Sequence, residues 1–204
     1  SKERFSTCKL KEPAMTINTP EFRVSYPSVF QPKKNDLNGE MEYSIVALFP
    51  KNANLGALKK MAQEAIVKKW GTDQSKWPAN LKSPFRDQGE KAKDVDGKRV
   101  LPPAHEEGAV FMTLRSKQRP SVVDQNVQEI LDTSKFYAGC WAIASVNAYA
   151  YDQKGNRGVS FGLGNIQFRR DGDPLGGRTR PEDDFSAVAS EGGASGGSAT
   201  SLFD

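Results

Sequence analysis

Aromatic side chains interleaved with lysine and arginine carry the most distinctive chemistry of this 204-residue chain. Nucleic-acid bases stack on aromatic rings, while nearby cations follow the phosphates of a single strand. The strongest stacking candidates are Tyr149 and Tyr151, because they alternate onto the same strand face as the polar Ser145 and Asn147. The further stacking candidates are Trp70, Trp77, Phe85, Phe136, Tyr137 and Trp141. The phosphate-contact candidates are Lys33, Lys34, Arg86, Lys91, Lys93, Arg115, Lys117, Arg119 and Arg157.

Each of these rings also has a purely structural interpretation, since an aromatic residue in a strand packs into a core more often than it faces a ligand. Trp70 ends an apolar helix stripe and is expected to pack inward. The pattern as a whole therefore carries more weight than any single ring.

Catalytic and metal-binding patterns are missing from the sequence. His105 is the only histidine and has no Cys or His at zinc-ligand spacing. The chain has no Gly-x-Ser-x-Gly elbow and no phosphate-binding Gly-x-x-x-x-Gly-Lys-Ser/Thr loop. Gly162-x-Gly164 lacks the third glycine of a dinucleotide site. We therefore expect no enzyme activity, no metal and no cofactor, and a hydrolase built on His105 is the weakest alternative.

Charge is distributed unevenly along the chain. The net charge is +4, but no Lys or Arg follows Pro181, and the last 24 residues carry five acidic side chains. Setting this tail of −5 apart leaves +9 on residues 1–180. A basic body suggests a polyanionic partner, and an acidic tail can compete for the same surface.

The two cysteines, Cys8 and Cys140, are too few for a disulfide framework, and Cys140 lies in an apolar run typical of a buried thiol. No apolar run approaches the ~20 residues of a membrane span, and no signal peptide is recognisable at the start. These features predict a soluble intracellular protein that is not secreted.

Alternating apolar residues predict several short strands. The expected strands are 19–28, ended by Pro27, then 41–49, 109–115, a short one within 122–130, and finally 136–151 and 159–168 joined by a turn at 152–156. Gly162 and Gly164 predict bends or close backbone approach in the last strand.

Residues 55–70 change to a helical period, with Asn54 as the expected N-cap and Gly71 as the C-terminal glycine. Residues 72–108 are rich in Pro, Gly, Lys and Asp and are expected to form a long functional or disordered loop. Several strands with one inserted helix predict a small β-barrel. From the pattern alone an OB-fold leads, with an SH3-like barrel or another small β-rich fold nearly as acceptable.

Five motifs in order connect the chain to a known family: Pro84-Phe85-Arg86-Asp87, Phe136-Tyr137-Ala138-Gly139-Cys140, Asn147-Ala148-Tyr149, Gly158-Val159-Ser160-Phe161-Gly162-Leu163 and Asp173-Pro174-Leu175-Gly176-Gly177. They resemble the single-stranded-DNA-binding proteins of tailed phages. The resemblance covers nearly the whole body, as far as Phe185.

This resemblance implies a five-stranded OB-fold barrel at 1–180, with extended loops and a disordered acidic Gly/Ser-rich tail at 181–204. It implies single-stranded DNA as the partner and a role in phage DNA replication, recombination or repair in the cytoplasm of the infected host. Such tails contact replication or recombination proteins, and the candidate residues here are Asp183, Asp184, Phe185, Phe203 and Asp204. The alternative is a protein-interaction or virion-assembly module with an incidental basic surface.

Overall fold

The computed structural model describes residues 15–36 and 38–176. The tail at 181–204 lies outside the described residues, and so do its candidate partner contacts Asp183, Asp184, Phe185, Phe203 and Asp204.

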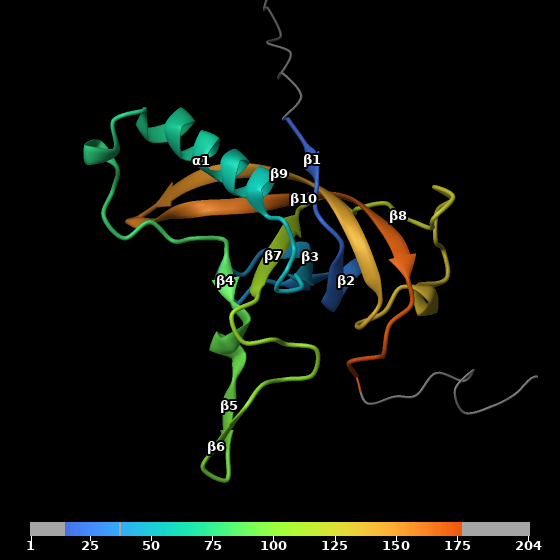
Figure 1. Cartoon of the computed structure of the whole chain (residues 1–204). Helices are drawn as coiled ribbons and strands as arrows, with labels where there is room; N and C mark the ends of the chain where they lie inside the picture. The colour runs from blue at the N-terminus through green and yellow to red at the C-terminus, as the bar shows by residue number, and fades with distance from the viewer. Residues whose placement is uncertain (1–14, 37, 177–204) are drawn as a thin grey trace, which may run out of the picture.

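Five strands close into a barrel (Figure 1). They are β2 (Phe22–Lys34), β3 (Met41–Leu48), β7 (Val110–Ser116), β9 (Trp141–Gln153) and β10 (Asn156–Arg170). Around the ring the order is β2-β3-β7-β10-β9, and β9 closes the ring by pairing with β2. The β7–β10 pair is parallel, whereas the other pairs in the ring are antiparallel. This Greek-key ring confirms the predicted OB-fold.

The barrel interior follows directly from the alternating sequence pattern. Phe22, Ile45, Leu114 and Phe161 are fully buried and belong to one apolar cluster. On β9 the inward face is built from small residues such as Ala142, which leaves room in the barrel for these larger side chains. The small-residue face of β9 is therefore the barrel interior.

Strand β2 does not end at Pro27, so that prediction is wrong. The pairing with β3 shifts between Ser25 and Ser28, and Tyr26 adopts a positive φ of 43°. This irregularity accommodates the missing N–H of Pro27 within a β-bulge, and the strand continues to Lys34.

Helix α1 (Gly56–Trp70) begins one residue later than predicted. The N-cap is Leu55 rather than the predicted Asn54, although the Asn54 side chain accepts a hydrogen bond from the Gly56 N–H at 3.0 Å. Gly71 ends the helix with a φ of 85°. Leu58 and Met61 are buried on the side that packs against β9 and β10. The helix covers the long β9–β10 hairpin in Figure 1.

The segment predicted as a long loop is largely structured. It contains the 3-10 turns η1 (Gln74–Lys76) and η2 (Gln88–Lys91) and the strands β4 (Arg86–Asp87), β5 (Lys93–Val95) and β6 (Lys98–Val100). Strand β4 pairs with β7, and β5 pairs with β6 in a hairpin that projects from the barrel (Figure 1). We call residues 88–108 the arm.

Three short elements complete the described chain: β1 (Ile17–Asn18), β8 (Val122–Val123) and η3 (Thr133–Lys135). The β9–β10 turn forms as predicted, with positive φ at Lys154 and Gly155. No helix among the described residues is long and apolar enough to cross a bilayer.

Candidate nucleic-acid interface

A groove of about 560 Å³ runs between the arm and the outer surface of β2 and β3. Ser25, Tyr26 and Val46 form its barrel side, and the Tyr26 side chain is 76% exposed. The arm side is lined by Lys91, Lys93, Val95, Val100, Leu101, Pro102, Pro103 and His105. The groove thus combines an exposed ring and apolar side chains with two cations, the chemistry that suits stacked bases and phosphates.

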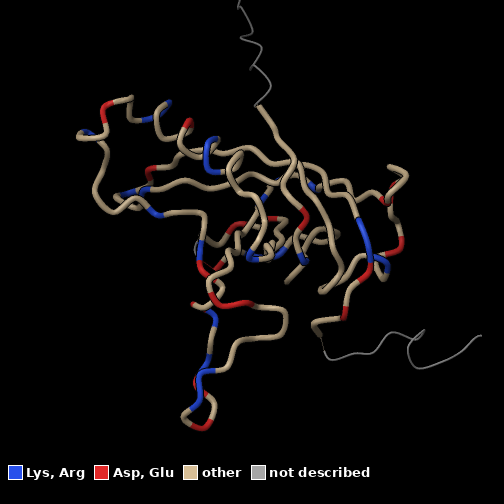
Figure 2. Tube along the Cα trace, viewed as in Figure 1, with Lys and Arg blue, Asp and Glu red and all other residues tan. Residues whose placement is uncertain are grey.

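The two groove lysines are available to an anion. Lys91 and Lys93 are exposed, and neither forms an ion pair with a carboxylate of residues 15–36 or 38–176. The Lys91 ammonium lies 5.1 Å from the ring centroid of Phe111, on β7. A phosphate can therefore approach both lysines without displacing a protein carboxylate. Figure 2 shows lysine and arginine along the arm, interspersed with aspartate and glutamate.

The outer face of β3 connects this groove to neighbouring surface on both sides. Ser44, Val46 and Leu48 alternate with the core residues of the strand, spaced roughly 7 Å apart, and Leu48 is itself buried. The strand register sets Ser44 beside Arg115 of β7 and Leu48 beside Arg23 of β2, with the groove at Val46 between them. A single strand lying along β3 would pass these positions in turn.

Beyond the Ser44 end lies a charged zone, which we define as Glu40, Glu42, Arg115, Lys117 and Tyr149. Arg115 Nε lies 2.8 Å from Glu42 Oε1, and Lys117 Nζ lies 2.9 Å from Glu40 Oε2. The Glu40 carboxylate raises the pKa of Lys117 above its usual value, and Glu42 and Tyr149 add to the effect. Tyr149 is 43% exposed, so its ring is accessible from solvent.

Glycines on β10 keep the surface beside the tyrosines low. A Cβ added to Gly158 would lie 2.8 Å from the Tyr151 hydroxyl oxygen, and one added to Gly162 would lie 2.5 Å from Asn147 Oδ1. The side chains of β9 therefore lean across the glycines of β10, which is the close approach predicted for Gly162. Tyr151 is half-buried by this contact and is a weaker stacking candidate than Tyr149.

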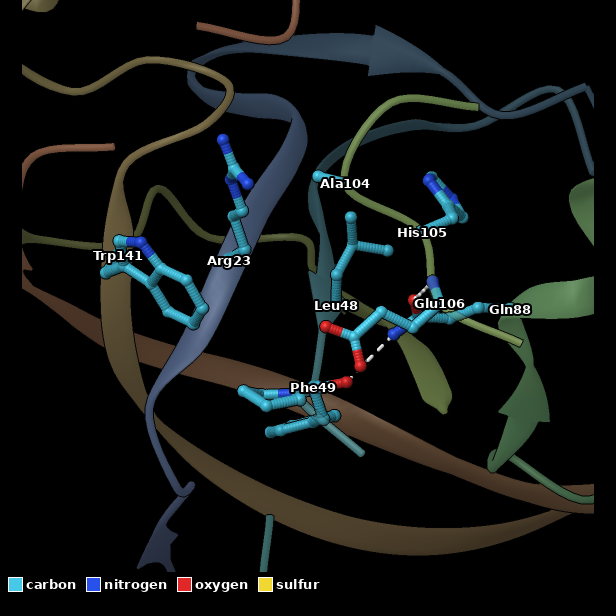
Figure 3. Close-up of a pocket in the computed structure, with 9 residues that line it drawn as sticks. Arg23, Leu48, Phe49, Gln88, Ala104, His105, Glu106 and Trp141 are labelled. Carbon is cyan, nitrogen blue, oxygen red and sulfur yellow. Dashed lines mark hydrogen bonds between the residues drawn. The ribbon is translucent and has the colours of Figure 1, made fainter. Parts of the chain in front are cut away.

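At the Leu48 end lies a smaller pocket of about 120 Å³. Figure 3 shows Arg23 and Trp141 on one side of Leu48 and His105 on the other. The Trp141 ring is half-buried, and the Arg170 guanidinium carbon lies 4.1 Å from its centroid. His105 lines both this pocket and the groove, so the two are adjacent.

Trp141 and Tyr149 lie on the same face of β9 but about 27 Å apart at ~3.4 Å per residue. They cannot stack on the same base. A strand that met both would have to follow the barrel surface from the charged zone to the small pocket.

Three aromatic candidates belong to the protein interior or to structural contacts, which corrects their assignment as stacking platforms. The Phe85 ring packs edge-on against Phe161, with centroids 5.9 Å apart. Phe136 is 3% exposed and belongs to the core. The Tyr137 hydroxyl donates to Asp171 Oδ1 at 2.8 Å, which fixes the segment before β9.

The remaining tryptophans lie at the C-terminal end of α1, away from the residues that line the groove. Trp77 Nε1 donates to the Gly71 carbonyl at 2.8 Å, and its ring is half-buried. Trp70 is half-buried beneath Lys69, whose ammonium lies 5.7 Å from the ring centroid. Trp77 does not line the groove.

Besides Arg115 and Lys117, two further predicted cations are held by carboxylates. Arg86 Nη2 lies 2.6 Å from Glu90 Oε2, and its guanidinium carbon lies 5.0 Å from the ring centroid of Phe111. Arg157 Nε lies 2.8 Å from Asp152 Oδ2 at the tip of the β9–β10 hairpin. Both side chains stay largely exposed, so they can reach a phosphate only in competition with these partners.

Lys33, Lys34 and Arg119 are exposed and stand apart from the groove. Lys33 pairs in register with Glu42 at the far end of β2, which puts it next to the charged zone. Arg119 follows β7 in a turn that leads to β8. These residues extend the basic surface rather than the groove itself.

Sequence reasoning missed Tyr26, His105 and the two valines of the arm as groove residues. The signal for the arm was present in Asp96-Gly97, since Asp-Gly is a strong hairpin turn, and both residues adopt positive φ. The exposure of Tyr26 had no comparable signal, because it depends on the bulge before Pro27.

The described part of the chain is expected to hold neither a metal cluster nor a reactive cysteine. It contains no group of three or more His, Cys, Asp or Glu side chains that could hold an ion. Burial raises the pKa of the Cys140 thiol to about 12, so this buried cysteine is protonated at neutral pH and is a poor nucleophile.

The chain is similar in sequence and in fold to known proteins. Residues 15–195 match the family model described as Enterobacter phage Enc34, ssDNA-binding protein. The chain belongs to this family. Its fold agrees with the single-stranded DNA-binding protein from bacteriophage Enc34 in complex with ssDNA, at a TM-score of 0.59 and 25% identity over 79% of this chain and 89% of that one.

One further relative and one protein of similar fold also come from phages. Putative protein p50 of Acyrthosiphon pisum secondary endosymbiont phage 1 is 28% identical over 183 residues, covering 86% of this chain and 95% of the relative. The single-stranded DNA binding protein gp2.5 encoded by bacteriophage T7 shares the fold at a TM-score of 0.54, with 12% identity over 81% of this chain and 97% of that one. The resemblance inferred from the five motifs is thereby confirmed.

Proposed function

We propose that the chain binds single-stranded DNA along the outer face of β3, from the charged zone through the groove to the small pocket. The observation that carries this proposal is the groove itself. It presents an exposed tyrosine and apolar side chains opposite two lysines that have no carboxylate partner among the described residues.

Two arguments support this assignment. The second and third strands of an OB-fold barrel, with the loops after strands one and four, are the usual binding face for oligonucleotides. These strands are β3 and β7 here, and the charged zone lies at the loop between β2 and β3. The related Enc34 protein is described in complex with ssDNA.

The mode we propose is sequence-independent, with bases stacked on Tyr26 and Tyr149 and phosphates beside Lys91 and Lys93. No described site carries the dense pattern of donors and acceptors that reads base edges, whereas rings and cations accept any base. Such binding suits a role in phage DNA replication, recombination or repair, where single strands are exposed transiently.

The deciding experiment titrates the full chain with an oligo-dT, the matching duplex and the matching RNA at two salt concentrations. We expect tyrosine and tryptophan fluorescence to be quenched by the single strand, with affinity falling by roughly 0.7 logarithmic units per phosphate contact for each tenfold rise in salt. Preference for duplex, or affinity that ignores salt, would refute the proposal. Failure to bind any of the three would instead favour a protein-interaction module.

A further inference from the structure

The arm is held to the barrel by one buried side chain. Gln88 is 1% exposed, and its Nε2 donates to the carbonyl oxygens of Phe49 and Val110, each at 2.9 Å. Its Oε1 accepts from the Glu106 N–H at 2.8 Å. Gln88 therefore connects the segment after β3, the start of β7 and the returning limb of the arm, as the dashed bonds in Figure 3 partly show. Buried amide groups that lose such partners are costly, so the connection is specific.

A second set of contacts, made by the Arg99 side chain, connects the two limbs of the arm. Arg99 Nη2 donates to the Gly89 carbonyl at 2.7 Å, and Nη1 lies 2.8 Å from Glu107 Oε1. Gly89 sits so tightly that an added Cβ would lie 2.7 Å from that same Glu107 oxygen. These hydrogen bonds therefore hold the two limbs of the arm together near the barrel.

The hairpin register then decides which residues face the groove. Lys93 pairs with Val100 and Val95 pairs with Lys98, whereas Arg99 belongs to the alternate face. Lys93, Val95 and Val100 line the groove, and the two valines are 51% and 47% exposed. The arm therefore turns a mixed cationic and apolar strip toward the barrel, and its bracing arginine away.

We propose that the arm is a preset wall of the DNA groove and that Gln88 is the residue that positions it. The inference rests on the proposed function. A loop of this length that ordered only on binding would lose backbone conformational entropy at that step. Hydrogen bonds already made in the folded protein remove that cost from binding and hold Lys91 and Lys93 opposite the strand's path.

The test compares Gln88→Leu, which keeps the volume but loses all three hydrogen bonds, with Lys91→Ala/Lys93→Ala and with the triple variant. Affinity for oligo-dT is measured across a salt series. We expect the slope of log affinity against log salt to become shallower by about 1.4 in the lysine variant, by a similar amount in Gln88→Leu, and by no more in the triple variant. The matched control is Gln63→Leu, an exposed glutamine of α1.

A residue with a merely structural role would lower the thermal midpoint and leave the salt slope unchanged, and that result would overturn the proposal. Folding of each variant is checked in a Cys8→Ser background, where the buried Cys140 thiol must stay unreactive at pH 8. Wild-type protein that fails to bind oligo-dT refutes the proposed function. Wild-type binding with an unchanged slope in folded Gln88→Leu refutes the inference alone.

Should Gln88→Leu fail to fold, Val95→Ser/Val100→Ser tests the same wall through exposed residues. We expect a loss of affinity of roughly three- to tenfold with an unchanged salt slope, because the removed contacts are apolar. Unchanged affinity would overturn the proposal. So would a change in molar mass by sedimentation without a change in affinity, which would make the arm a contact between copies of the chain.

Discussion

The arm side of the groove and the charged zone present cations in opposite states. Lys91 and Lys93 have no carboxylate partner in the described chain, whereas Arg115 and Lys117 are held by Glu42 and Glu40. A phosphate that approaches the charged zone competes with a carboxylate already in place. One that approaches the arm meets two lysines that no carboxylate of the described chain holds, although Lys91 also lies 5.1 Å from the Phe111 ring centroid.

This difference separates two contributions to binding. The arm is expected to supply most of the salt-dependent part of the binding free energy. Lysines without a carboxylate partner neutralise phosphates fully, and this releases the counterions condensed on the DNA. The charged zone is expected to act mainly through the Tyr149 ring, because its cations are already neutralised by carboxylates. An exposed ion pair of this kind contributes only about 0–1 kcal/mol. The number of cations on a surface is therefore a poor measure of its attraction for DNA.

The largest expected effect on binding comes from removing the exposed ring of each region, Tyr26 in the groove and Tyr149 in the charged zone. Tyr149→Ala and Tyr26→Ala should each weaken oligo-dT binding by roughly five- to 150-fold, since a stacked base contributes about 1–3 kcal/mol. Fluorescence titration measures both, and Tyr149→Phe, which keeps the ring, should bind nearly as the parent does. A loss in only one of the two alanine variants would confine the strand to that side.

The next effect isolates the salt-dependent term. Lys91→Ala/Lys93→Ala should bind oligo-dT more weakly than the parent at low salt. The difference in affinity should shrink as salt rises from about 50 to 200 mM, because the variant makes fewer phosphate contacts. Lys59→Ala/Lys60→Ala removes the same charge from the exposed face of α1 and serves as the control. If both pairs behave alike, the net charge of the protein matters and the groove does not.

The barrel was predictable because its strands obey local rules. The alternating pattern of β9 and β10 and the turn at Lys154-Gly155 place the main hairpin, and Gly71 ends α1 where the sequence indicates. OB-fold and family followed from the order of five motifs rather than from the pattern, which had left a second barrel type open.

Where prediction failed, a local rule met a tertiary contact. Pro27 normally ends a strand, but the bulge at Tyr26 lets β2 continue and exposes the ring that the groove uses. Phe85 stands in a polar segment that suggests exposure, yet β4 pairs with β7 and carries the ring onto Phe161.

The state of the cations could not be read from the sequence for the same reason. Glu42 and Arg115 lie far apart in the chain and meet only because β3 and β7 are neighbours in the barrel. The groove likewise requires the arm to fold back over β2 and β3, which depends on the buried contacts of Gln88.

The smallest expected effect tests the competition within the charged zone directly. Glu42→Gln keeps an oxygen that can accept the 2.8 Å hydrogen bond from Asn35 but removes the charge that holds Arg115. We expect oligo-dT affinity at low salt to rise by roughly two- to fourfold, matching an ion pair of under about 1 kcal/mol, and the gain to disappear at high salt. Glu64→Gln on exposed α1 controls for the lost charge.

The sign of this result decides what the Glu42 carboxylate does. Its side chain is only 12% exposed, so the pair also orients the Arg115 guanidinium. Tighter binding means that the carboxylate competes with phosphate, and the contrast between the two regions holds. Weaker binding, with the thermal midpoint unchanged, means that DNA uses Arg115 in the orientation that Glu42 sets. The charged zone would then be as prearranged for phosphate as the arm, and pairing would no longer distinguish the two regions.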